Sequence, residues 1–138
     1  MNFKQFFTLS FFFISLYSLS YADDTELGVI MDEVNGILKK IARDESLDNP
    51  ARAQLAKEAA ELYINSLKHK PADIEFLFKT DLERAIAIAD YKAMIGLSYA
   101  HLCSLEIAYL KNDEAAIEQA LSDIKASKKK GHKKYIDE

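Results

Sequence analysis

Two side chains that could ligate iron stand near opposite ends of the chain. Met31 carries a thioether and His132 an imidazole, and each lies on or beside an apolar stripe of a predicted helix. Together these two groups fill both axial positions of haem iron, an arrangement that favours electron transfer. This chemistry requires a fold that brings residues 31 and 132 to the same end of the molecule.

The last predicted helix changes character shortly before His132. Its positions at alternating steps of four and three are Ile117, Leu121, Ile124, Lys128, Gly131 and Tyr135. The stripe therefore loses its apolar side chains in its last turns, where a core helix should keep them. Glycine inside a helix costs on the order of 1 kcal/mol relative to alanine. We expect either that the helix frays at Gly131 or that a flat, bulky group lies against the bare backbone, with His132 facing it.

The N-terminal segment predicts export. Lys4 precedes a nearly continuous apolar run from residue 6 to residue 17. The small residues Ser20 and Ala22 stand three positions and one position before the expected cleavage site, where a signal peptidase recognises small side chains. The run is too short for a good membrane span. We expect a signal peptide over 1–22, cleaved after Ala22, and a periplasmic domain over 23–138 with no membrane span; the alternative is an uncleaved N-terminal anchor.

Charge and cysteine content narrow the class of protein. The 138-residue chain has a formal net charge of −4 at pH 7. This balance argues against a partner that is a nucleic acid and against a polybasic membrane-surface protein. Cys103 is the only cysteine, so no internal disulfide can form. It is expected to be a small buried hydrophobe; a metal or redox role stays open.

The periodicity of the chain predicts four helices. The first begins near Thr25, which could cap it, and ends near Arg43; Asn49-Pro50 then starts the second, with Asn49 as the N-cap. Residues 69–73 break that helix, and 74–78 should form a helical turn over one end of the fold. A long helix over about 81–111 and a last helix capped by Asp113 complete the chain. Short loops favour antiparallel neighbours, and the predicted fold is an all-α, up-down-up-down four-helix bundle.

Apolar spacing also identifies the expected interior positions. For the first helix these are Leu27, Met31, Val34, Leu38 and Ile41, widened by Ile30 and Ile37; for the second, Leu55, Ala59, Leu62, Tyr63 and Leu67. For the long third helix they are Leu82, Ile86, Ala89, Ala93, Ile95, Leu97, Leu102, Leu105 and Tyr109.

The two ends of the chain resemble the cytochrome b562 family, and more distantly cytochrome c′. The first helix has Met31 where that family has its methionine ligand, with Val34, Asn35 and Leu38 in step. The tail has His132 followed by Lys134-Tyr135, like the family's terminal histidine. The resemblance implies a periplasmic electron carrier that holds haem b non-covalently through Met31 and His132. It also implies that Lys128 meets a haem propionate, and that the protein is a monomer or weak dimer that serves a redox partner protein.

The chain departs from the c-type relatives in having no CxxCH motif. Lys128 and Gly131 stand where its cysteines would be, so covalent haem attachment is excluded. The alternative function is a haem-free bundle that holds a metal through His132, His101 or His69, or that binds a protein. An enzyme is not expected, because no Ser/His/Asp set, phosphate-binding loop or HExxH motif occurs.

Overall fold

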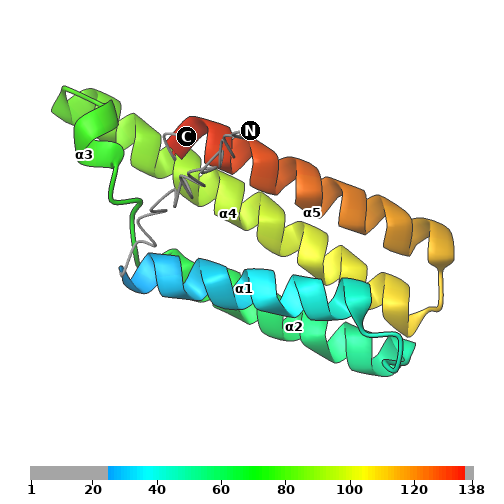
Figure 1. The fold of residues 1–138 in the computed structure, drawn as a ribbon. Helices are drawn as coiled ribbons and strands as arrows, with labels where there is room; N and C mark the ends of the chain where they lie inside the picture. Colours follow the sequence, from blue (N-terminus) through cyan, green and yellow to red (C-terminus); the bar gives the residue numbers. More distant parts are fainter. Residues whose placement is uncertain (1–24, 136–138) are drawn as a thin grey trace, which may run out of the picture.

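The computed structural model describes residues 25–135. The predicted signal peptide, its cleavage site and the last three residues of the chain lie outside this range. Five helices make up the described part (Figure 1). They are α1 (Glu26–Arg43), α2 (Asn49–Ser66), α3 (Ile74–Leu77), α4 (Asp81–Leu110) and α5 (Glu114–Tyr135). The prediction of an all-helical fold is therefore confirmed for residues 25–135.

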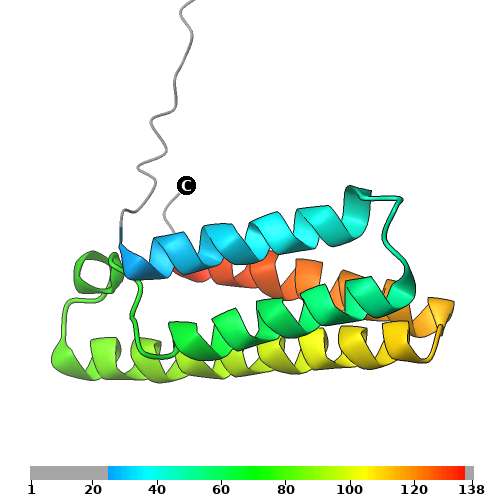
Figure 2. The same ribbon diagram turned by 90° about the horizontal axis from the view of Figure 1, so that it is seen from below.

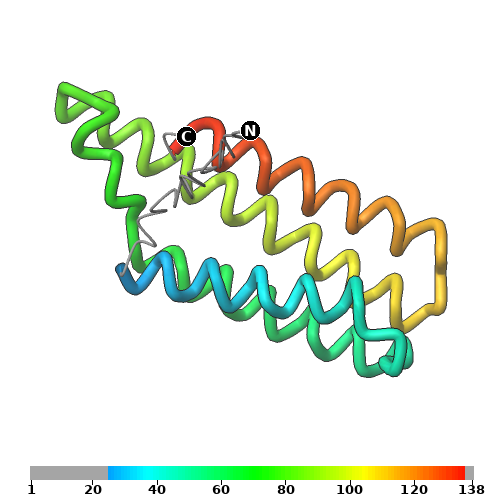
Figure 3. Tube along the Cα trace, viewed as in Figure 1, coloured from blue at the N-terminus to red at the C-terminus, as the bar shows by residue number. Residues whose placement is uncertain are grey.

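The four long helices lie side by side, and each runs opposite to the long helix before it (Figures 1 and 2). The closely packed pairs are α1 with α2, α2 with α4, and α4 with α5, while α3 packs more lightly on α4. The Cα trace in Figure 3 follows the longest helix, α4, past the end of α5. Because the four long helices alternate in direction, α1 and α5 also run in opposite directions, and α1 starts at the end of the fold where α5 finishes.

Local sequence signals explain where the helices begin. Thr25 Oγ1 accepts a hydrogen bond from Gly28 N at 3.1 Å, and Asp113 Oδ1 accepts one from Ala116 N at 3.1 Å, so both predicted caps are confirmed. Thr80 and Glu83 form a reciprocal capping box at the start of α4. The predicted corner before α5 is made by Asn112, whose φ of 52° is tolerated by asparagine better than by most residues.

The predicted cap of α2 is wrong by one residue. Asp48, not Asn49, accepts the capping hydrogen bond, from Ala51 N to Asp48 Oδ1 at 2.9 Å. The carboxylate takes the capping position, and Asn49 becomes the first helical residue. Asn49 Nδ2 then donates to Asn112 Oδ1 at 2.8 Å, which ties the start of α2 to the α4–α5 corner.

The predicted interior of α4 is only partly correct. Ile95, Leu102, Leu105 and Tyr109 are buried as expected. The side chains predicted to be buried that instead lie at the surface are Leu82, Ile86, Ala89, Ala93 and Leu97. The cause is that α4 has two apolar faces, so its periodicity does not identify the one that packs inside. Among the described helices, α4 is long and apolar enough to cross a membrane. Core helices of soluble proteins meet the same two criteria of length and composition.

Candidate functional site

One hydrogen bond between side chains links α1 and α5. Lys128 Nζ of α5 donates to Asn35 Oδ1 of α1 at 2.8 Å. Farther along the same two helices, Ala42 and Leu121 line one hollow. Because the helices run in opposite directions, a step forward on α5 matches an equal step back on α1. Both pairs of residues fit one antiparallel alignment, with residue 128 opposite 35 and 121 opposite 42.

The same alignment brings the two predicted iron ligands to one level. One helical turn beyond Lys128 lies His132, and one turn before Asn35 lies Met31, each step covering about 6 Å. Met31 is half-buried and packs against the core, and His132 is half-buried near the end of α5. The third predicted site residue, Lys128, is exposed and engaged with Asn35. We call the part of the fold where α1 and α5 face each other the α1–α5 side. We infer that the three predicted site residues lie on this side, at the end of the fold where α1 starts and α5 finishes.

The backbone around Gly131 settles one of the sequence-based alternatives. The helix does not fray at Gly131, since α5 continues to Tyr135. A Cβ built on Gly131 would lie 3.4 Å from Cε of Met94, an ordinary van der Waals contact. The bare backbone of Gly131 therefore faces a flexible side chain of α4. Any flat group at this position would have to displace Met94.

The end of α5 is fastened to α4 by a polar cluster. Asp90 Oδ2 accepts hydrogen bonds from Lys134 Nζ, at 2.7 Å, and from the Tyr135 hydroxyl. These two bonds lower the pKa of Asp90, with Lys134 contributing most. Burial and the neighbouring Asp90 raise the pKa of Tyr135. The cluster holds the last turn of α5, and with it the backbone that carries His132.

A buried hydroxyl lies behind this cluster. The rings of Tyr91 and Tyr135 meet edge to face, with centroids 6.1 Å apart. Within the part of the chain that the structure describes, Tyr91 Oη is buried and has no hydrogen-bond partner. Burial raises the pKa of Tyr91, an effect that the nearby Ser66 hydroxyl reduces. Ser66 itself donates to Tyr63 O at 2.7 Å. Because the Ser66 hydroxyl lies close enough to lower the pKa of Tyr91, the Tyr91 hydroxyl is not an open position for a ligand.

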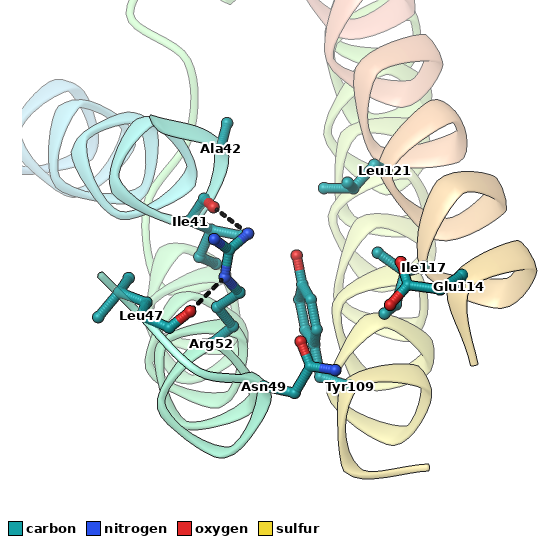
Figure 4. A pocket seen from close by; sticks show the side chains of 9 residues that line it. All are labelled: Ile41, Ala42, Leu47, Asn49, Arg52, Tyr109, Glu114, Ile117 and Leu121. Carbon is teal, nitrogen blue, oxygen red and sulfur yellow. Dashed lines mark hydrogen bonds between the residues drawn. The ribbon is translucent and has the colours of Figure 1, made fainter. Parts of the chain in front are cut away.

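A hollow of about 430 Å³ opens at the other end of the α1–α5 side (Figure 4). Its walls include Ile41 and Ala42 of α1, Arg52 of α2, Tyr109 of α4 and Leu121 of α5. The sequence analysis did not single out this region. The one feature of the sequence that could have indicated it is Arg52, which lies in the first turn of the alanine-rich helix α2. This arginine is close in sequence to the loop between α1 and α2, which it holds.

Arg52 has a structural role at this hollow. Its guanidinium donates to the carbonyl oxygens of Ile41 at 3.0 Å, Asp44 at 3.0 Å and Leu47 at 3.2 Å. The last carbonyls of a helix have no partner within the helix, so this side chain satisfies the end of α1 and the loop that follows. All of these donors point at carbonyls of the chain itself, which leaves the guanidinium little capacity for a ligand.

The remaining candidate metal ligands lie apart from one another. His69 Nδ1 lies 3.3 Å from Glu26 Oε2, and His101 Nδ1 lies 4.0 Å from Asp123 Oδ2. Cys103 is half-buried, so the expectation of a fully buried thiol is not met. Across residues 25–135, no group of three or more His, Cys, Asp or Glu side chains could hold a metal ion. A site for a bare metal ion thus has no ligand cluster in the described region.

The donor set at the α1–α5 side fits haem in part. A thioether and an imidazole at one level are the ligands that a six-coordinate iron needs, and α1 and α5 are not among the closely packed pairs of described helices. The Tyr91 hydroxyl lies near Ser66 and Tyr63 of α2, so it does not add to this donor set. The contact between Met94 and Gly131 is the feature that a bound macrocycle would have to rearrange.

Comparisons with known proteins found no match for this chain. No protein-family model matches the chain, and no curated protein or solved structure is detectably similar to it.

Proposed function

We propose that the chain is an up-down-up-down four-helix bundle of the cytochrome b562 type, which binds haem b non-covalently and carries electrons in the periplasm. Met31 and His132 are the proposed axial ligands. One observation supports the proposal most: the Lys128–Asn35 hydrogen bond, 2.8 Å long, fits an antiparallel alignment in which residues 31 and 132 are at one level. A redox partner protein is part of the proposal.

Haem would supply an iron centre that gains and loses one electron. The thioether of Met31 and the imidazole of His132 would fill both axial positions, leaving none for a gas or a peroxide. Lys128 could exchange its bond to Asn35 for a propionate, because both partners are at the protein surface. The Asp90–Tyr135 hydrogen bond would keep the last turn of α5, and so His132, in a fixed orientation.

A haem-free bundle that binds a protein is the second candidate, and one observation favours it. Met94 already packs against the backbone of Gly131, so the described end of the fold is filled without a cofactor. In this alternative the lysines between 128 and 134 would form a docking surface for an acidic partner.

The deciding experiment is a haem titration of the purified protein under reducing conditions, followed by absorption spectroscopy. We expect a saturable, one-to-one, low-spin spectrum. Met31→Leu, which keeps the volume but removes the sulfur, and His132→Ala should each lose the low-spin spectrum and weaken haem binding by about tenfold or more. His69→Ala is the matched control and should bind as the parent does. Broad, non-saturating absorption of the parent protein would favour the haem-free alternative.

A further inference from the structure

The outward side of α4 has a continuous apolar strip. Its members follow at alternating steps of four and three, and none of them is charged; we call them the outer face of α4. They are Leu82, Ile86, Ala89, Ala93, Gly96, Ala100, Cys103, Ile107 and Leu110. Eight of the nine are exposed and Cys103 is half-buried. The opposite side of α4, with Tyr91, Ser98 and Leu105, is buried. Such a repeat over four heptads is the pattern of a helix that packs on another helix.

Nothing within the described chain explains the outer face. Leu82 is 70% exposed, Leu110 60% and Ile107 52%. Gly96 lies in the middle of a 30-residue helix, where glycine costs about 1 kcal/mol relative to alanine. A Cβ built on Gly96 meets no atom within 4 Å. The glycine therefore gives no packing benefit inside a single chain, whereas it would allow a close approach by a second helix.

The outer face has the same residue type on both sides of Gly96 in three of its four pairs of positions, and the fourth pairs an alanine at 89 with the cysteine at 103. Counting outward from it, alanine at 93 corresponds to alanine at 100, and Leu82 corresponds to Leu110. Between them, Ile86 corresponds to Ile107. Two helices that cross at an angle are closest at the crossing point and diverge toward their ends. Small side chains at the centre and large ones at both ends match that geometry when the same helix supplies both sides.

We propose that a second copy of this chain packs on the outer face of α4, with the two α4 helices antiparallel and the two-fold axis at Gly96. A two-fold interface uses the same patch on both copies, and in the antiparallel pairing the large residues at one end of the patch meet the large residues at the other end. The start of α4 extends past the end of α5, since the Tyr135 hydroxyl reaches only to Ala87 O. In the dimer this overhang lies against the end of α4 of the other copy. The proposal does not depend on haem.

Charge along the edge of the outer face supports the antiparallel direction. Glu83 follows Leu82 and Lys111 follows Leu110, both on the same edge. Antiparallel pairing sets Glu83 of one copy opposite Lys111 of the other at both ends of the interface. In a parallel pairing the two edges would lie on opposite sides of the interface and Glu83 would be far from Lys111, so this charge pair could not form.

The size of the face indicates a dimer of modest affinity. Residues 82–110 span about 42 Å of helix, and a strip roughly 10 Å wide then covers on the order of 400 Å² in projection on each copy. Only the side chains of the outer face are counted in this area. Two copies together give about 800 Å² in projection, which side-chain relief increases toward the lower limit for specific interfaces, about 1,200 Å². We expect dissociation in the micromolar range.

Sedimentation velocity of protein purified from cells expressing the full-length chain tests the proposal, at concentrations from about 1 to about 500 μM. We expect the mass to double across this range. Gly96→Glu should raise the dissociation constant by at least about tenfold, because it places two charges at the axis. Gly36→Glu is the matched control: this glycine also lies in a helix with no atom within 4 Å of a Cβ, but in α1. A mass that stays monomeric throughout, or a dimer that tolerates Gly96→Glu, would overturn the proposal.

Oxidative cross-linking tests the direction of the helices. Residue 89 and residue 103 are equidistant from Gly96, so in Ala89→Cys the new thiol should form a disulfide with Cys103 of the other copy, identified by mass spectrometry of the linked peptides. Preferred Cys103–Cys103 linkage in the same variant would contradict the antiparallel arrangement. Sedimentation with phosphatidylcholine vesicles is measured in parallel. A protein that binds the vesicles through the outer face and remains monomeric in solution would assign that face to a membrane instead.

Discussion

The α2–α4 interface and the α1–α5 side are built from different residues. On α2 the buried side chains facing inward are mostly alanines, at positions 53, 56, 59 and 60. Opposite them α4 presents larger buried side chains, including Tyr91, Ile95 and Leu102. The α1–α5 side instead has half-buried residues such as Met31 and Leu121, together with a hollow. The small side chains of α2 let the larger ones of α4 come close, and these two helices are the most closely packed pair of the described chain.

The difference separates stability from ligand binding. A well-packed pair of helices resists insertion of any group, because packing atoms would have to be displaced. At the α1–α5 side, the link between the two helices is the hydrogen bond from Lys128 to Asn35, which lies at the surface. A macrocycle could enter there at a smaller cost in packing. Stability should therefore depend mainly on α2 and α4, and cofactor binding on α1 and α5.

The largest expected effect is on the α4 interior. Leu102→Ala removes a side chain that is 0% exposed, and should lower the free energy of unfolding by about 2–5 kcal/mol. Leu121→Ala makes the same chemical change beside the hollow, where the side chain is already half-exposed, and should cost about 1 kcal/mol or less. Urea unfolding followed by circular dichroism measures both. Equal losses would remove the contrast between the two interfaces.

An intermediate effect is expected at Arg52. Arg52→Gln removes charged donors from three carbonyl oxygens at the end of α1 and in the following loop, and should lower the free energy of unfolding by about 1.5–3 kcal/mol. The loss should appear as faster amide exchange in residues 41–47. Arg43→Gln removes an exposed guanidinium from the last turn of the same helix and serves as the control. If both variants lose the same stability, the bonds of Arg52 do not hold this end of α1.

The helices were predictable from the sequence because their signals are local. Thr25, Asp113 and the asparagine corner at 112 each act within a few residues of themselves, and the structure uses all three. The cap of α2 failed by one residue because Asp48 and Asn49 are both good caps. Asn49 is instead bound to Asn112, and the sequence near Asn49 could not predict this contact because Asn112 is 63 residues away. A helical turn was also predicted over 74–78, and the structure has it over Ile74–Leu77.

The site was less predictable, for a physical reason. Sequence spacing identified Met31, His132 and Lys128, but not the contact that aligns their helices, because Lys128 and Asn35 are 93 residues apart. The helix periodicity of α4 could not separate its two apolar faces, since both have the same repeat. Nor could spacing reveal that Met94 would lie against Gly131. Whether haem binds through Met31 and His132 stays a prediction.

The smallest expected effect concerns pH and sharpens the comparison at the end of α5. Hydrogen bonds from Lys134 and Tyr135 hold the pKa of Asp90 below its usual value, so the folded state binds the proton less readily than the unfolded state does. The stabilisation is therefore complete above about pH 4 and is lost as the pH falls through the folded pKa. Asp90 is 39% exposed, so its contribution should stay below about 1 kcal/mol.

Unfolding of the parent and of Asp90→Asn at neutral pH and near pH 3 measures this contribution. The difference between the two proteins should be present at neutral pH and should shrink in acid. Asp32→Asn, at an exposed position of α1, controls for the loss of one negative charge. A difference that persists unchanged in acid would mean that Asp90 acts through packing rather than through its charge. The last turn of α5, and the orientation of His132, would then depend on the Tyr135 ring against Tyr91 instead.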